Sequence, residues 1–163
     1  MSAPHAFPPN DKVASGQLTV PEPSALVLFD TQKILLRPQV EESVGLDAQW
    51  SDSLPKLLQA KIIQSFENAN YPQAVARPTE GLAADYQLLI DIRSFQLMLL
   101  PEPRADVEFS AKILAEDGRL VGSRIVHVSV PAQATDAAAA AAGLNEAFGK
   151  AATELVLWVS SLI

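Results

Sequence analysis

The chain has 163 residues, of which 48% are hydrophobic and 19% are charged, and 12 Lys and Arg against 19 Asp and Glu give a formal net charge of −7. This length and composition fit one globular domain. The basic residues are scattered along the sequence and form no run that could displace counterions from phosphates, which excludes nucleic acid as a partner. The absence of cysteine excludes disulfides, thiolate catalysis and cysteine zinc sites.

The N-terminal segment differs in composition from the rest. Residues 1–24 contain five of the twelve prolines, which predicts a flexible arm or tether, whereas residues 25–163 predict a single folded domain. Residues 1–5 have neither the basic start nor the apolar stretch of a secretion signal. The sequence by itself therefore leaves open a cytosolic protein or an exported one whose leader lies outside it.

The first predicted elements are strands and then a helix. Residues 25–29 and 33–37 are short apolar runs followed by breakers, which indicates two strands. Apolar residues then recur at three- and four-residue steps, which predicts a helix. Ser51 or Asp52 can cap its start, and Pro55 suits its first turn, where a missing N–H costs nothing.

The middle of the chain predicts an antiparallel meander. Apolar residues alternate with polar ones over residues 86–93 and again over 107–113, as they do in half-buried strands. Asp117 and Gly118 favour a hairpin turn, because glycine tolerates positive φ. Three alternate valines over residues 126–130 mark the return strand.

The last predicted element is a long helix. Asp136 is a good N-cap, six alanines follow over residues 137–142, and an apolar stripe continues to Leu162. Charged residues such as Glu154 interrupt that stripe, which is unlike a membrane span. The predicted fold class is therefore α+β: a mainly antiparallel sheet with two long helices packed on one face.

The sequence predicts no catalytic, metal or cofactor site. His5 lies in the proline-rich arm, and His127 is expected to face away from the valines of its strand, as a solvated residue with no partner at ligand spacing. Glu41, Glu42 and Asp47 are interpreted as hydrated loop carboxylates. Glycine-rich phosphate loops and serine nucleophile motifs are absent from the sequence. We therefore expect a protein that is not an enzyme.

One apolar segment interrupts the alternation just before a Pro-Glu-Pro turn. Its residues form the candidate contact for a partner or a lipid: Phe95, Leu97, Met98, Leu99 and Leu100. The competing interpretation is a strand end that is covered on both faces, and it is preferred on general grounds because continuous apolar strands are usually buried.

Seven features between residues 18 and 163, taken in order, carry a resemblance to a known family. They are Ile34-Leu35-Leu36-Arg37, Trp50-Ser51-Asp52-Ser53-Leu54-Pro55, Ala74-Val75-Ala76-Arg77-Pro78, Ala84-Asp85-Tyr86-Gln87-Leu88, Asp91-Ile92-Arg93-Ser94-Phe95, the Asp117-Gly118 hairpin and the alanine-rich helix through Trp158. In this order and spacing the chain resembles the ABC-type transport auxiliary lipoproteins, which accompany transporters that contain MCE (mammalian cell entry) domain proteins.

The resemblance implies a non-catalytic accessory protein of the periplasm. Such a protein would be held to a membrane, the outer one, by a lipid on an N-terminal cysteine, and this sequence contains neither that cysteine nor a signal peptide. It would support traffic of lipid or hydrophobic solute by docking the MCE-domain subunit, and a lipid or a second copy of the chain are further partners. The alternatives are a stand-alone periplasmic carrier of an apolar ligand and, third, an envelope hydrolase.

Overall fold

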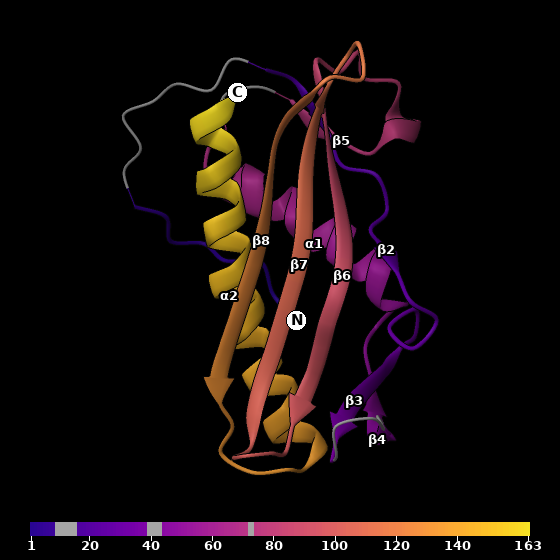
Figure 1. Ribbon diagram of the computed structural model, residues 1–163, viewed down its shortest axis with the longest axis vertical. Coiled ribbons are helices and arrows are strands. Elements are labelled where there is room, and N and C mark those ends of the chain that lie inside the picture. Colours follow the sequence, from indigo (N-terminus) through magenta and orange to yellow (C-terminus); the bar gives the residue numbers. More distant parts are fainter. Residues whose placement is uncertain (9–15, 39–43, 72–73) are drawn as a thin grey trace.

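The computed structural model describes residues 1–8, 16–38, 44–71 and 74–163. In these residues an eight-stranded sheet packs against two α-helices, α1 (Leu54–Asn68) and α2 (Ala137–Leu162). Both helices lie behind the sheet in Figure 1. The predicted α+β class is confirmed. None of the helices in the described residues is long and apolar enough to cross a bilayer.

The centre of the sheet is the predicted meander. Strands β6 (Tyr86–Met98), β7 (Arg104–Ala115) and β8 (Leu120–Pro131) pair antiparallel along nearly their full lengths. The β7–β8 hairpin turns at Asp117 and Gly118, and Gly118 has a φ of 84°, which a residue with a Cβ adopts only with strain. The hairpin prediction is confirmed.

The other edge of β6 pairs in succession with three short strands that run parallel to it. These are β1 (Leu18–Thr19), β2 (Ser24–Ala25) and β3 (Lys33–Arg37). Strand β4 (Val44–Gln49) pairs antiparallel with β3, and β5 (Val75–Ala76) pairs parallel with β1. The sheet is thus mixed. After β3 and β4 the chain passes through α1, and β6 then runs in the same direction as β1, β2 and β3.

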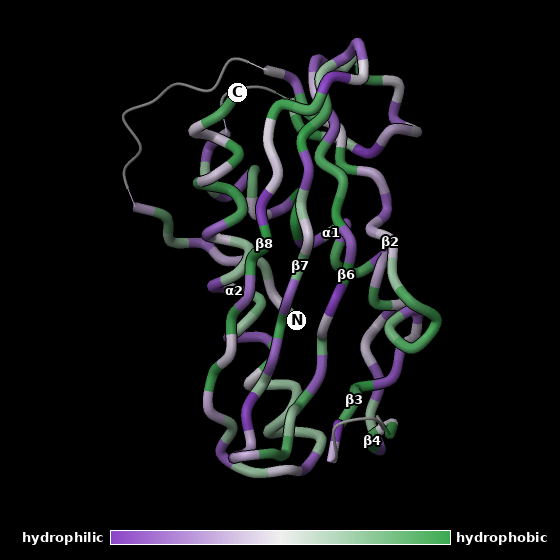
Figure 2. Tube along the Cα trace, in the orientation of Figure 1, coloured by the Kyte–Doolittle hydropathy of each residue, from purple (hydrophilic) through white to green (hydrophobic). Residues whose placement is uncertain are grey.

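The predicted strand over residues 25–29 is wrong beyond Ala25. Residues 27–29 form a turn, in which the carbonyl oxygen of Leu26 accepts hydrogen bonds from Phe29 N at 2.9 Å and Asp30 N at 3.1 Å. We call Leu26-Val27-Leu28 the apolar turn. Its side chains are 71%, 91% and 43% exposed, whereas Phe29 is buried. Figure 2 shows it as a hydrophobic loop at the side of the sheet, below β2.

The core lies between the inner face of the meander and the helices. Phe109 of β7 meets Phe148 of α2 edge to face, with ring centroids 6.4 Å apart. Burial of such a side chain stabilises the fold by roughly 1.5–3 kcal/mol. At the start of α2, Asp136 accepts a hydrogen bond from Ala139 N at 2.8 Å, which confirms the predicted cap.

Residues 1–8 lie against both helices. The backbone N–H of Ser2 donates to Asn145 of α2 at 2.7 Å, Asn68 of α1 donates to the carbonyl oxygen of Pro4 at 2.9 Å, and Ala3 is buried. The start of the proline-rich segment therefore packs across the two helices, on the side away from the outer face of the sheet.

Candidate functional site

The apolar segment 95–100 divides into a buried part and an exposed part. Phe95 and Leu97 are buried on the inner face of β6, where the ring of Trp50 meets Phe95 edge to face at 6.0 Å. Their role in the structure is to fix the end of β6 to the core.

The exposed part is the end of the strand, Met98-Leu99-Leu100, which we call the strand-end patch. Met98 and Leu99 are half-buried, and Leu100 is 56% exposed. The backbone N–H of Leu99 donates to Arg37 O at 3.1 Å, so the patch is held against the end of β3. Val44, which is also exposed, begins the neighbouring strand β4. This end of the sheet thus presents aliphatic side chains on an ordered backbone.

A polar array crosses the outer face of the meander. The hydroxyl of Ser94 on β6 donates to Asp106 Oδ2 on β7 at 2.6 Å, and His127 Nε2 on β8 lies 2.6 Å from Asp106 Oδ1. His127 Nδ1 also lies 3.7 Å from Glu108, which pairs with Arg93 at 2.8 Å. Although they lie on the outer face, Ser94 and Asp106 are buried.

His127 faces away from the valines, as predicted, but the expectation that it has no partner is wrong. Its partners come from the neighbouring strand, so spacing along the sequence does not reveal them. The register does: the hairpin at Asp117 and Gly118 places Glu108 opposite His127. Glu41 and Glu42, two of the predicted loop carboxylates, lie outside the described residues, and Asp47 on β4 is exposed.

The order of groups in the array does not suit nucleophilic hydrolysis. A serine nucleophile needs a base on its hydroxyl, and that base is commonly a histidine oriented by an acid. Here the carboxylate of Asp106 stands between Ser94 and His127 and binds both. Among residues 1–8, 16–38, 44–71 and 74–163, His, Asp and Glu form no group of three or more suited to a metal ion. The array therefore joins three strands and lacks the serine–histidine hydrogen bond of that arrangement.

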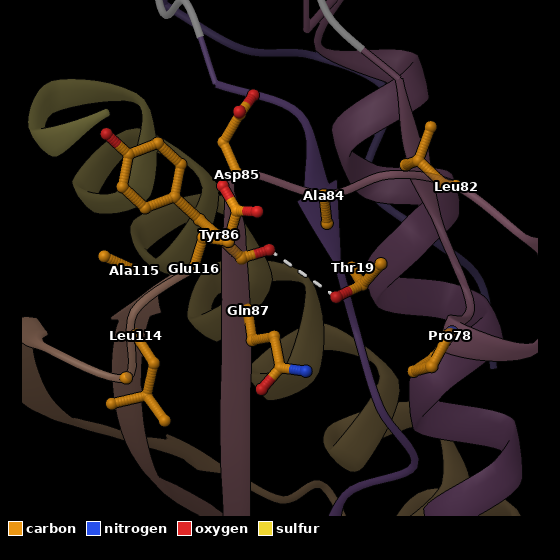
Figure 3. Close-up of a pocket in the computed structure, with 11 residues that line it drawn as sticks. Thr19, Pro78, Leu82, Ala84, Asp85, Tyr86, Gln87, Leu114, Ala115 and Glu116 are labelled. Atoms are coloured by element: carbon orange, nitrogen blue, oxygen red, sulfur yellow. Dashed lines mark hydrogen bonds between the residues drawn. The ribbon is translucent and has the colours of Figure 1, made fainter.

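The opposite end of the sheet holds a small pocket of about 340 Å³ with a mixed polar and apolar lining, drawn in Figure 3. Thr19 of β1, Gln87 of β6 and Glu116 of the β7–β8 hairpin are among the residues that line it. The hydroxyl of Thr19 donates to Tyr86 O at 3.5 Å, and Asp85 accepts a hydrogen bond from Gln17 N at 2.9 Å. These two polar groups thus hold the N-terminal segment against β6.

Tyr71 lies near this end of the sheet and ties the same segment to the end of α1. Its hydroxyl donates to Gly16 O at 2.7 Å. Burial, followed by the nearby Tyr86 and Asp85, raises the pKa of Tyr71 to about 12. The neutral hydroxyl is thus the form that the fold favours.

Comparison with protein families gives one match over most of the chain. The family model described as "ABC-type transport auxiliary lipoprotein component" matches residues 2–156. An uncharacterized protein of Bradyrhizobium diazoefficiens is 39% identical over 158 residues, which are 97% of this chain and 43% of that protein, so the chain spans less than half of its relative.

Two solved structures have a similar fold. Protein XCC0632 of Xanthomonas campestris is 34% identical, with a TM-score of 0.87 over 99% of this chain and 93% of that chain. A second structure, of an uncharacterized protein, has a TM-score of 0.74 at 12% identity, over 98% of this chain and 99% of that chain. The second likeness is one of fold alone.

Proposed function

Since the chain belongs to the family of ABC-type transport auxiliary lipoprotein components, we propose that it is a non-catalytic periplasmic accessory protein which docks the MCE-domain subunit of a lipid or hydrophobic-solute transporter. The proposed location is the outer membrane, reached through an N-terminal lipid of the native precursor. The observation that carries the proposal is the family match over residues 2–156. The polar array supports it, because the buried serine is bonded to a carboxylate and not to the histidine that commonly activates a serine nucleophile.

The strand-end patch is the proposed docking surface. Leu100 projects at the end of β6, and Phe95 and Leu97 hold that strand in the core, so the patch is presented on a rigid support. A rigid aliphatic patch loses little conformational entropy when a partner covers it. We therefore assign the contact to Met98, Leu99 and Leu100 and give Phe95 and Leu97 a supporting role.

The packed space between the sheet and α2 favours the accessory role over a stand-alone carrier that holds its ligand there. A carrier needs an apolar cavity of some hundreds of Å³ for its ligand. Between the sheet and α2, the side chains of Phe109, Leu144 and Phe148 are fully buried, and the two phenylalanine rings are in contact. Protein purified without detergent is expected to carry no lipid in native mass spectrometry.

A second copy of the chain is a further proposed partner. Strand β8 pairs only with β7 among the described residues, so its other edge offers backbone groups that a strand of another copy could bind. The concentration dependence of the sedimentation coefficient tests this association.

The proposed docking is tested by titrating the purified soluble part of the MCE-domain subunit from the same transport system. We expect saturable binding, and roughly tenfold weaker binding by the Leu100→Ser variant, because a central apolar contact is commonly worth 1–2 kcal/mol or more. Ile125→Ser is the matched control, since Ile125 is equally exposed but lies on β8. Failure of the wild-type protein to bind would contradict the proposal.

A further inference from the structure

The apolar turn is the most exposed aliphatic feature of the described residues. Val27 and Leu26 have the two highest exposed fractions among the large hydrophobic side chains there, 91% and 71%, and they are adjacent in the chain. Single exposed aliphatics are common on protein surfaces, but a contiguous exposed group marks a contact. The strand-end patch does not include this turn, and no group of the polar array lies in it.

The turn is held rigidly on both sides. Before it, Ser24 pairs with β6, and its hydroxyl donates to Asp91 at 2.8 Å. After it, Phe29 is buried, and the carbonyl oxygen of Thr31 accepts a hydrogen bond from Leu54 N at 2.8 Å, at the start of α1. Leu26 O closes the turn itself through two backbone hydrogen bonds. A loop anchored in this way pays little entropy on binding.

The charges around the turn favour a basic partner. Glu22, Asp30 and Asp91 are exposed carboxylates next to it in the chain or across the β2–β6 pairing, whereas Lys33 is the exposed cation that follows. The whole chain carries a net charge of −7. An anionic lipid surface would therefore repel this region.

The turn also lacks the aromatic residues that are enriched at membrane–water interfaces. Interfacial anchors commonly use Trp and Tyr, whose rings sit at the headgroup level. The turn contains only leucine and valine, and the aromatic residue beside it, Phe29, is buried in the core. Aliphatic side chains with an acidic surround are complementary to an apolar protein pocket with a basic rim.

We propose that the apolar turn inserts into such a pocket on the same partner that the strand-end patch docks, and so forms a second, separate contact. This inference rests on the proposed function. Strand β3 leads from the turn to Arg37, which is bonded to Leu99 of the patch. The turn follows Ala25, which lies opposite Ile92 of β6, and the patch begins at Met98 of the same strand. Six residues of strand span about 20 Å, so one partner surface can cover both contacts. Figure 1 shows β3 running down the same side of the sheet from the loop below β2.

The inference is tested with the soluble MCE-domain subunit and the double variant Leu26→Ser/Val27→Ser. We expect the variant to bind at least roughly tenfold more weakly than the wild-type protein, with an unchanged midpoint of thermal unfolding. Leu120→Ser/Ile125→Ser, on β8, is the matched double control and should bind as the wild type does. Asp30→Asn should weaken binding at low salt and lose this effect at high salt.

The outcomes separate this inference from the proposed function. If the wild-type protein binds and Leu100→Ser weakens binding while the turn variant does not, the inference is wrong and the proposed function stands. If the wild-type protein does not bind, both fail. The remaining outcome comes from flotation with phosphatidylcholine vesicles and with phosphatidylcholine–phosphatidylglycerol vesicles. If the wild-type protein binds either kind of vesicle and the turn variant does not, the turn is a contact for a lipid surface and the inference is wrong.

Discussion

Two apolar segments of similar composition have opposite surroundings in the structure. Residues 25–29 look like a buried strand in the sequence, yet the side chains of Leu26, Val27 and Leu28 project into solvent. Residues 95–100 interrupt the alternation of their strand, and the preferred interpretation of them is a strand end covered on both faces. Phe95 and Leu97 are indeed buried in the core, whereas Leu100 at the end of the segment is exposed.

The difference lies in the sheet neighbours of each segment. Up to Met98, β6 pairs with β7 on one edge and with β3 on the other, so its side chains are carried over the core. Strand β2 pairs for only two residues before the chain turns away from β6. Hydrophobicity therefore shows that burial of a segment is favourable. The strands that pair with the segment decide whether it is buried within the same molecule. An apolar turn left uncovered points to another molecule.

The largest expected effect separates the two ends of the 95–100 segment. Leu97→Ala should lower the free energy of unfolding by about 2–5 kcal/mol, because it leaves a cavity under a fully buried side chain. Leu100→Ala should change that free energy by less than about 0.5 kcal/mol. Urea unfolding followed by circular dichroism measures both. Equal losses in the two variants would remove the distinction between buried and exposed ends.

The polar array should give the next largest effect. Asp106→Ala removes the acceptor shared by Ser94 and His127, and we expect a loss of about 1–3 kcal/mol in the free energy of unfolding. The control is Asp47→Ala, because Asp47 is an exposed carboxylate on β4. A loss no larger than that of the control would show that the array contributes nothing to the free energy of unfolding.

Ionisation of Tyr71 should lower the stability of the wild-type protein at alkaline pH. The folded state raises its pKa to about 12, so between pH ~10 and ~12 the folded state binds this proton more tightly than the unfolded state does. Stability from this group is complete below pH ~10 and is lost as pH rises through that window. The difference in unfolding free energy between the wild type and Tyr71→Phe should therefore shrink from pH 9 to pH 12. A constant difference would refute the shift.

The smallest expected effect belongs to the apolar turn. Val27→Ser should alter the free energy of unfolding by less than about 0.5 kcal/mol, because its side chain contacts mainly water. Phe29→Ala, two residues later, should cost about 3–5 kcal/mol, since Phe29 is buried in the core. Differential scanning calorimetry of the two variants makes the comparison. A large loss for Val27→Ser would mean that the turn packs on the protein itself.

Short sequence patterns predicted the elements that are determined by residues close together in the chain. The alternation in β6 and β7, the Asp117-Gly118 turn and the Asp136 cap depend on neighbouring residues, and the structure confirms all of them. The parallel pairing of β1, β2 and β3 with β6 depends on a crossover, which no short pattern encodes. For the same reason the exposure of the apolar turn escaped prediction. The partners of His127 escaped it because they lie across the β7–β8 hairpin, where the strand register, and not spacing along the chain, brings them together.

The most direct test of the central claim is site-specific photo-cross-linking in cells. A photoreactive phenylalanine analogue at position 27 or at position 100 of the full-length protein should form adducts with the MCE-domain subunit of the transport system, identified by mass spectrometry. The same analogue at position 125, on β8, should not. Adducts to that subunit from neither position 27 nor position 100, with the protein correctly exported, would contradict the account.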